Sequence, residues 1–433
     1  MTPLQIGLLG CALLLILLCT SMPVAFAMIF TGVLGFSLIV SPHAAFSMVV
    51  SDIFSTFSSY NLTVIPLFVF MGQVAFHAGI SKRLFRSAYA WIGHFPGGLA
   101  MATVGACAGF GAICGSGPAT AATMTSVALP EMRRYRYSDE LAAGTIAAGG
   151  SLGMLIPPSV VFIVYALMTE QSIGSLFLAG IVPGILIVLL FCLSIGFRCR
   201  GNKGLGPAGP RSSWGTRFRE LGGVLETVIL FVFVMGGMFI GLFTPIEAAA
   251  VGAGGSLVIA LVKRALTWKI LKQILFETVR TSAMVFFIVT GAVIFGRFLA
   301  VSQIPFAVAE WFTNLPLPGI LTMFLIILFF LIAGCFIDAL ALVLLTIPIF
   351  YPVIIELGYN PIWFGVMVVV ITQMGVITPP VGVNVYVVSG IERDIPLQSI
   401  FRGALPFLLM LVIAAVILTV FPQIPLWLPN LSG

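Results

Sequence analysis

The chain has 433 residues, of which 60% are hydrophobic and only 8% are charged. Soluble domains carry about 25% charged residues, so this composition excludes a soluble globular protein and predicts a polytopic membrane protein. The net charge is +6, but the 20 Lys and Arg residues cluster in a few loops, so they mark membrane orientation and not a nucleic-acid-binding patch.

Long apolar runs recur in both halves of the chain. The first half has runs at residues 4–20, 24–40, 61–80, 140–166 and 177–197, and the second half at 224–243, 245–262, 280–300, 361–388 and 404–421. Between the third and fourth run of each half lies another apolar stretch, 96–131 and 318–351. At about 35 residues, each of these two stretches is too long for a single membrane span.

An internal repeat is indicated by the dipeptide Pro-Pro, which interrupts an apolar run at 157–158 and again 222 residues later (379 − 157) at 379–380. The same offset pairs Pro23 with Pro245, Gly97 with Gly319, and Tyr137 with Tyr359. Paired interrupted segments are typical of secondary transporters with a binding site at the membrane midplane. The chain therefore divides into a first repeat, a cytoplasmic linker and a second repeat, at residues 1–200, 201–222 and 223–433.

Basic residues indicate how the two long apolar stretches are oriented. The stretch 96–131 is preceded by Lys82, Arg83 and Arg86 and followed by Arg133, Arg134 and Arg136. By the positive-inside rule both of its ends face the cytoplasm, so it enters and returns as a re-entrant helical hairpin. The stretch 318–351 has Glu310 and Glu356 near its ends and no basic residue close by, which places its ends outside.

Five spans per repeat is an odd number, so the second repeat is inverted relative to the first. The predicted fold is an all-α polytopic membrane protein with two inverted-topology repeats. Each has about five spans, one re-entrant helical hairpin (96–131 or 318–351) and one interfacial arm helix (46–54 or 268–276). Both chain termini are expected on the periplasmic side.

The proline pairs also predict a cation site. Pro157 and Pro158 lack a backbone N–H and exclude the carbonyl groups one turn earlier, so oxygens near Gly153 and Met154 lose their helical partners. A hard cation such as Na⁺ can replace those partners. An ionisable residue deep in an apolar stretch, such as Asp338, is functional by default, although a structural N-cap is the alternative. The candidate Na⁺ ligands are Ser116, Gly153, Met154, Gly334, Asp338, Gly375 and Thr378.

Helix N-termini predict an anion site at the same depth. A helix can begin at the turn Gly115–Thr120 and another at Pro158–Ser159, and each exposes unpaired N–H groups at a positive dipole end. The candidate substrate-binding residues are Ser116, Gly117, Thr120, Ser159 and Asn384. The alternative is that the proline pairs are only kinks. Arg297, near the external end of its span, is expected to snorkel to the membrane surface, with binding of a substrate carboxylate as its alternative.

Several strings together resemble one transporter family. They are Phe95-Pro96-Gly97-Gly98-Leu99-Ala100, Gly115-Ser116-Gly117-Pro118-Ala119-Thr120, Ile156-Pro157-Pro158-Ser159, Thr244-Pro245-Ile246-Glu247-Ala248 and Thr378-Pro379-Pro380-Val381-Gly382. Over nearly the whole chain, they resemble the large membrane subunit of tripartite ATP-independent periplasmic (TRAP) transporters. The sequence departs from that pattern at Gly117-Pro118 and Arg136-Tyr137, which weakens a side-chain role for residue 117.

The resemblance implies a permease of the bacterial inner membrane that imports organic acids, such as dicarboxylates, keto acids or sugar acids. It also implies a Na⁺ gradient as the driving force and an elevator-type motion. Two partners are implied, a small four-span membrane subunit and a periplasmic substrate-binding protein. No organic cofactor is expected.

Two alternative functions would make different demands on the sequence. A stand-alone Na⁺- or H⁺-coupled anion carrier of a related inverted-repeat hairpin fold would need no binding protein. An intramembrane enzyme would need a nucleophile with its base or a metal cluster, and no expected span combines Ser with His or contains HExxH. We therefore expect a transporter and not an enzyme.

Overall fold

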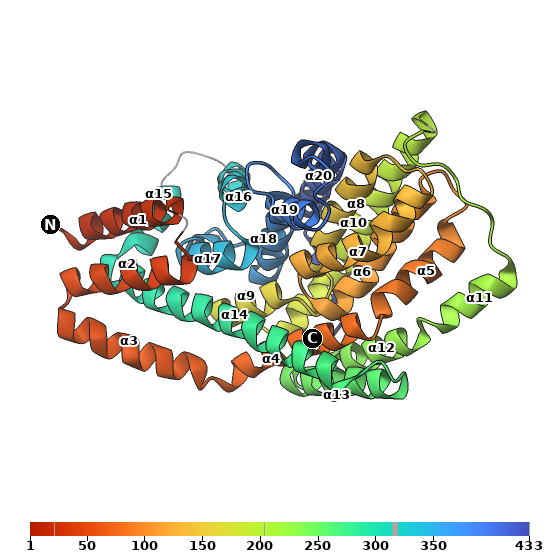
Figure 1. Cartoon of the computed structure of the whole chain (residues 1–433). Helices are drawn as coiled ribbons and strands as arrows, with labels where there is room; N and C mark the ends of the chain where they lie inside the picture. The colour runs from red at the N-terminus through yellow and green to blue at the C-terminus, as the bar shows by residue number, and fades with distance from the viewer. Residues whose placement is uncertain (21, 203, 314–318, 433) are drawn as a thin grey trace.

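The computed structural model describes residues 1–20, 22–202, 204–313 and 319–432 (Figure 1). Residue 203 of the expected linker, Pro318 at the start of the expected second hairpin, and residue 433 lie outside the described residues. Every regular element in the described part of the chain is helical. The prediction of an all-α protein is therefore confirmed.

The helices follow one another closely along the chain. The first half contains α1 (Pro3–Cys19), α2 (Val24–Ile39), α3 (Pro42–Phe57), η1 (Tyr60–Thr63), α4 (Val64–His77), α5 (Ile80–Ile92), α6 (Gly98–Cys114), α7 (Gly117–Arg134), α8 (Asp139–Ser151), η2 (Leu152–Met154), α9 (Val160–Thr169) and α10 (Ile173–Gly201). The second half contains α11 (Trp214–Gly222), α12 (Leu225–Phe239), α13 (Pro245–Val262), α14 (Trp268–Ser302), α15 (Ile304–Thr313), α16 (Gly319–Gly334), α17 (Ala339–Glu356), α18 (Pro361–Gly375), α19 (Val383–Ile391), α20 (Leu397–Val420) and α21 (Gln423–Ser432).

The chain is a multi-pass membrane protein. Six described helical segments are long and apolar enough to cross a bilayer, and a seventh candidate is the pair α11 and α12, which bend by 47° at their junction. The six are η1 with α4, α10, α13, α14, α17 and α20. Of these, α17 lies in the stretch expected to form the second hairpin, and the other five lie in expected spans. The remaining expected spans form shorter apolar helices, such as α1 with 17 residues and α2 with 16. Length alone therefore identifies fewer spans than the ten expected from the apolar runs.

Each of the two long apolar stretches forms a pair of helices joined by a short turn. The first stretch divides into α6 and α7, and the second into α16 and α17, and the helices of each pair pack against each other. Gly115 ends α6 with φ +64, a conformation that favours glycine. Ser116 then caps α7, and Asp338 caps α17.

The two expected spans that contain a proline pair are both interrupted. The first divides into α8, η2 and α9, with the chain non-helical from Leu155 to Ser159, and the second into α18 and α19. Both Pro-Pro peptide bonds are cis. The first pair is buried, whereas Pro379 and Pro380 are exposed.

One expected element differs from the structure. The arm helix predicted at 268–276 is the first part of α14, which continues without interruption to Ser302 (Figure 1). Residues 268–290 contain no Pro or Gly, so nothing in this segment ends the helix. In the first half, 46–54 does lie in a separate helix, α3.

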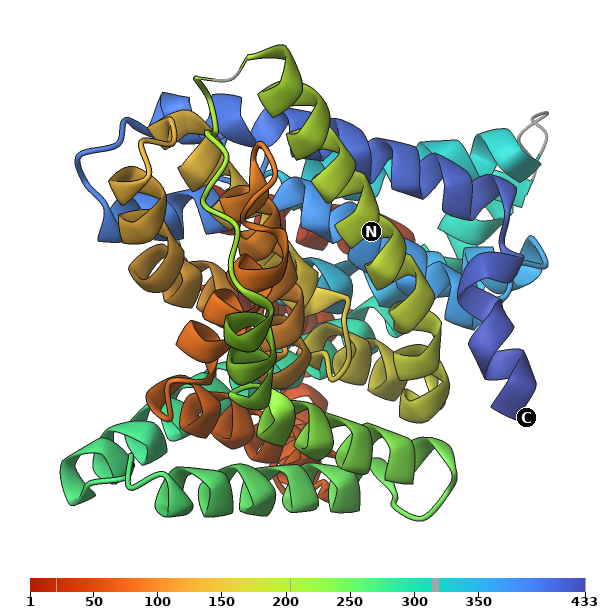
Figure 2. The same ribbon diagram turned by 90° about the vertical axis from the view of Figure 1, so that its right-hand side faces the viewer.

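The helices pack into two groups. We define the frame as α2, α4, α12, α13 and α14, and the core as α6–α10 with α16–α20; packing within each group is extensive. Figure 2 shows α12 and α13 side by side along one edge of the molecule. The groups touch mainly where α4 meets α6 and where α14 meets α17.

The linker is bound to the base of the first hairpin. The backbone N–H of Gly97 donates to Gly206 O at 2.9 Å, and the N–H of Ser138 donates to Leu205 O at 3.0 Å. The Tyr137 hydroxyl donates to Pro207 O at 3.0 Å and accepts from the Leu99 N–H at 3.1 Å. Both ends of the hairpin α6–α7 therefore meet one short segment and lie on the same side of the molecule.

Candidate functional site

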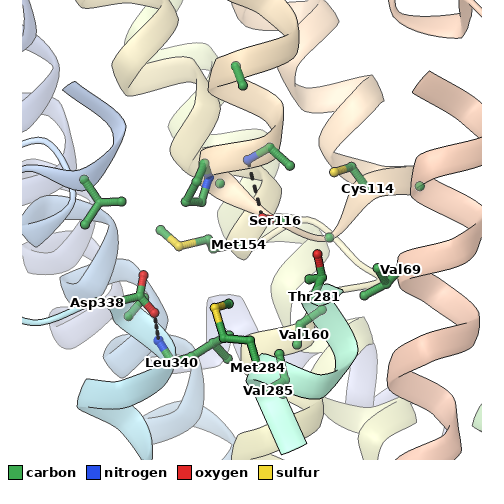
Figure 3. Close-up of a pocket in the computed structure, with 18 of the residues that line it drawn as sticks. Val69, Cys114, Ser116, Met154, Val160, Thr281, Met284, Val285, Asp338 and Leu340 are labelled. Atoms are coloured by element: carbon green, nitrogen blue, oxygen red, sulfur yellow. Dashed lines mark hydrogen bonds between the residues drawn. The ribbon is translucent and has the colours of Figure 1, made fainter. Parts of the chain in front are cut away.

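A cavity of about 770 Å³ lies between the frame and the core (Figure 3). Its core wall is formed by the turn of the first hairpin, the start of α9 and the start of α17. Its frame wall is formed by α2, α4 and α14. Figure 3 shows Ser116 and Met154 of the core, with Thr281, Met284 and Val285 of α14 facing the same space.

Ser116 and Gly117 line this cavity at the N-terminus of α7. The Ser116 hydroxyl accepts from the Ala119 N–H at 3.5 Å, and Pro118 occupies the first turn. The first turn of a helix has N–H groups without intrahelical acceptors and a positive dipole end. The first hairpin turn therefore presents an environment that suits a negatively charged group.

Asp338 lines the same cavity from α17. Its Oδ2 accepts from the Leu340 N–H at 3.1 Å, which is the bond expected of an N-cap. Figure 3 shows the carboxylate at the cavity edge, on the same side as Met154. Asp338 both caps α17 and lines the cavity, so its position is compatible with a structural role and with binding a cation.

The first interrupted helix packs directly on the first hairpin turn. A Cβ on Gly153 would lie 2.7 Å from Thr120 Oγ1 and 2.9 Å from Ser116 O, so only glycine fits there. The Thr120 hydroxyl donates to Ser116 O at 2.8 Å. Thr120 thus supports the backbone of the turn, and it lies outside the residues that line the cavity.

Ser159 occupies a similar supporting position. Its side chain is fully buried, and its hydroxyl donates to Met154 O and accepts from the Phe162 N–H. The carbonyl that was expected to be free at Met154 therefore has a partner. Met154 itself lines the cavity, whereas Ser159 does not.

The second interrupted helix repeats this arrangement against the second hairpin. A Cβ on Gly375 would lie 2.4 Å from Gly334 O. The Thr378 hydroxyl donates to Met374 O at 2.6 Å, and the N–H of Val381 donates to Cys335 O at 3.2 Å. Gly334, Gly375 and Thr378 thus lie together, outside the residues that line the cavity.

Asn384 lies apart from the cavity wall. It is fully buried in α19, and its Nδ2 donates to Ala147 O of α8 at 2.9 Å. Its Oδ1 has no hydrogen-bond partner among the described residues. Asn384 thus links the two halves of the chain, and its predicted contact with substrate stays a prediction.

Sequence reasoning missed the polar residues that the frame contributes to the cavity. Gln73 of α4 and Glu277 and Thr281 of α14 line it, and Glu277 accepts from Gln273 Nε2 at 2.9 Å. The four-residue spacing of Glu277 and Thr281 is the signal that could have identified this face of α14. No Lys, Arg or His is among the residues that line the cavity. The described part of the chain also contains no group of three His, Cys, Asp or Glu residues able to hold a metal ion.

The fold is that of membrane transporters. The YdaH transporter of Alcanivorax borkumensis superimposes with a TM-score of 0.62 at 16% identity, covering 88% of each chain. MtrF of Neisseria gonorrhoeae superimposes with a TM-score of 0.55 at 14% identity, covering 87% of this chain and 83% of that one. At these identities the likeness concerns the fold alone.

Sequence relatives define the family. The chain is 39% identical over 397 residues to the C4-dicarboxylate TRAP transporter large permease protein DctM of Pseudomonas aeruginosa, covering 92% of both proteins. It is 36% identical to the sialic acid TRAP transporter large permease protein SiaM of Vibrio cholerae, covering 96% of both. It is 30% identical to the ectoine/5-hydroxyectoine TRAP transporter large permease protein UehC of Ruegeria pomeroyi, covering 97% of both.

The family described as "Tripartite ATP-independent periplasmic transporter, DctM component" matches residues 11–424. The chain belongs to this family of large permease subunits. The resemblance expected from the sequence strings is thereby confirmed. Its relatives are transporter permeases and not enzymes.

Proposed function

We propose that this chain is the large permease subunit of a Na⁺-coupled transporter that imports an organic acid anion across the bacterial inner membrane. A periplasmic binding protein delivers the anion, and a small four-span membrane subunit completes the transporter. The observation that carries the proposal is the cavity between frame and core, where the N-termini of α7 and α17 place Ser116 and Asp338 on one wall. Relatives named for C4-dicarboxylate and sialic acid support an organic acid as the substrate.

The repeats of this permease are inverted, each with five spans, a re-entrant hairpin and an arm. Contacts related by the 222-residue offset support this. Tyr137 binds the Leu99 N–H near the base of the first hairpin, and a Cβ on Gly319 would lie 3.8 Å from the Tyr359 hydroxyl near the base of the second. Each hairpin therefore begins and ends on one side, as re-entrance requires.

The conformation described is inward-facing. On α14 the cavity is lined from Glu277 to Ile288, the half of the helix that follows Lys269 and Lys272. On the other side of the cavity α14 packs against α17, with residues 289–291 and 342–346 buried. Because basic residues mark the cytoplasmic side, the open end of the cavity faces the cytoplasm.

Coupling ions bind at the two interrupted helices. Na⁺ is a hard cation that prefers oxygen ligands, and carbonyl groups at interrupted helices supply them in transporters. The contact of Gly153 with the first hairpin turn and of Gly375 with the second brings such oxygens together in two places. Bound cations would also offset the charge of an anion in a cavity that no basic side chain lines.

The runner-up function is a stand-alone Na⁺- or H⁺-coupled anion carrier of similar fold. The two functions differ in their requirement for a binding protein. Uptake by reconstituted vesicles should depend on added periplasmic binding protein if the tripartite function is correct. Full uptake without it would favour the stand-alone carrier.

Asp338 provides the test of cation coupling. Asn is as good an N-cap as Asp, so Asp338→Asn keeps the bond to Leu340 and removes the charge. We expect Asp338→Asn to abolish Na⁺-driven accumulation in vesicles while thermal unfolding stays near wild type. Asp338→Ala, which removes the cap as well, should also lower the unfolding temperature. Wild-type uptake and Na⁺ dependence in Asp338→Asn would make the residue a cap and nothing more.

A further inference from the structure

A second cavity, of about 300 Å³, lies between the frame and the core at the other end of α14 and α17. It is lined by Met168 of α9, by residues 292–300 of α14 and by residues 347–352 of α17. None of these residues lines the larger cavity. The two cavities are therefore separate hollows along one interface.

One face of α14 lines both cavities. The residues of this face follow one another at steps of three or four, as the face of a helix requires. In the larger cavity they are Glu277, Thr281, Met284 and Ile288, and in the smaller one Ala292, Gly296 and Ala300. α17 likewise lines both, from Asp338 to Ala341 and from Ile347 to Pro352. The two hollows therefore lie along one interface, and α14 packs on α17 between them.

Arg297 is a basic residue at this interface. It lines the smaller cavity, and no other Lys, Arg or His lines either hollow in the described chain. Its Nη2 donates to Asp52 Oδ1 of α3 at 3.2 Å. The Asp52 side chain is 3% exposed and the Arg297 side chain 62% exposed.

This pairing holds the guanidinium in place without covering it. A buried carboxylate binds one N–H of a group that has five donors in a fixed planar fork. The remaining donors stay available, and guanidinium binds carboxylate in a bidentate way. Tyr351 is fixed beside it, since its hydroxyl donates to Thr169 O at 3.3 Å and accepts from Gln171 Nε2 at 3.1 Å. The smaller cavity is thus lined by an Arg side chain that Asp52 holds and by a Tyr side chain that two hydrogen bonds hold.

We propose that Arg297 forms an external carboxylate-binding subsite, at which the substrate anion docks before it passes between α14 and α17. The proposal rests on the proposed import of an organic anion and on the orientation inferred for it. Asp52 neutralises part of the Arg297 charge, so the anion is held weakly enough to move on. The subsite acts on substrate arriving from outside, whereas the larger cavity is open to the cytoplasm.

The test compares the two sides of the membrane. The full chain is reconstituted with its small membrane subunit, the periplasmic binding protein is added on the outside, and succinate is the probe. We expect Arg297→Gln to raise the KM for external succinate by roughly tenfold or more, the effect of losing a hydrogen-bonded charge. Vmax and the KM for internal succinate, measured by exchange, should change by less than about twofold. Arg297→Lys should recover part of the external affinity, and Asp52→Asn should lower the external KM.

If the KM for external and for internal succinate rise equally, or if only Vmax falls, Arg297 has a structural role and does not bind the substrate. Because Arg297→Gln leaves the buried Asp52 unpaired, the double variant Arg297→Gln/Asp52→Asn is measured as well. If the subsite exists, the double variant must show a higher KM for external succinate and a nearly unchanged KM for internal succinate. An unchanged external KM in a folded double variant overturns the proposal.

A labelling experiment separates the subsite from Na⁺-coupled transport. Ala300→Cys, in a background without the native cysteines, is modified from outside with a membrane-impermeant maleimide. Millimolar succinate should slow the reaction when Arg297 is present and not in Arg297→Gln. If succinate slows labelling of Ala300→Cys but the protein shows no Na⁺-driven uptake, the proposed function is refuted and the subsite is kept. Uptake without protection by succinate or N-acetylneuraminate would refute the subsite and keep the proposed function.

Discussion

At the scale of single residues, glycine sets the distance between each hairpin turn and its interrupted helix. Gly375 touches the Gly334 carbonyl so closely that a Cβ would lie 2.4 Å from the oxygen. The obstacle is backbone, which cannot rotate away as a side chain would. Any larger residue must therefore move the second hairpin away from α18.

We predict that Gly375→Ala destabilises the protein by about 1–3 kcal/mol, the usual cost of overpacking a well-packed contact. Thermal unfolding in detergent measures this, and the concentration of Na⁺ for half-maximal uptake should rise in the same variant. The matched control is Gly254→Ala in α13, where a Cβ meets nothing within 4 Å. Alanine is the better helix former, so Gly254→Ala should be neutral or stabilising. Equal behaviour of the two variants would show that the close contact is unimportant.

Individual site residues were harder to place from the sequence than the site itself. Glycine, proline and hydroxyl residues around 116 and 157 correctly marked a turn and an interrupted helix. They could not show that Thr120 and Ser159 use their hydroxyls on nearby carbonyl groups and lie outside the cavity lining. That choice depends on side-chain rotamers within a packed contact. Likewise, the Arg297–Asp52 pair joins residues 245 positions apart and has no local signal.

At the scale of elements, the linker is hydrogen-bonded to the base of the first hairpin. Tyr137 is buried and bonds both the start of α6 and the linker carbonyl of Pro207. Burial raises the pKa of Tyr137 to about 12. The hydroxyl therefore stays protonated, and able to donate, at any physiological pH.

We predict that Tyr137→Phe lowers the free energy of unfolding by about 1–3 kcal/mol, because it leaves the Leu99 N–H and the Pro207 carbonyl without this partner. Limited proteolysis should then cut the segment 202–213 faster than in the wild type. Tyr60→Phe is the control, since the Tyr60 side chain is 70% exposed. If Tyr137→Phe resists protease as well as Tyr60→Phe does, the linker is held by its other bonds alone.

Element boundaries followed from the sequence where a breaker residue was present. Pro245 begins α13, and the proline pairs interrupt their spans at the expected places. The arm at 268–276 is predicted as a separate element because apolar and Lys residues alternate there at helical spacing and the segment is too short to span, although no breaker lies between it and the rest of α14. The helix α11 was not predicted from the sequence, because it has only 9 residues and lies inside a segment that is polar as a whole. It packs on α5 through Trp91 and Trp214, a contact between segments distant in sequence.

At the scale of the whole molecule, the proposed inverted repeat would place equivalent residues on opposite sides of the membrane. Arg134 ends α7 in the first hairpin, and Glu356, 222 residues later (356 − 134), ends α17 in the second. Both side chains are exposed. Arg211 in the linker and Asn430 near the C-terminus are exposed reference positions for the two sides.

We predict that single cysteines at these four positions, in a background without native cysteines, divide into two pairs. In intact cells a membrane-impermeant maleimide should label Glu356→Cys and Asn430→Cys, and it should reach Arg134→Cys and Arg211→Cys only after the membrane is opened. The reason is that each hairpin begins and ends on one side, and an odd number of spans per repeat puts the two hairpins on opposite sides. Labelling of Arg134→Cys and Glu356→Cys from the same side would rule out the inverted repeat. The inward-facing assignment of the larger cavity would then lose its basis, and so would the external position of Arg297.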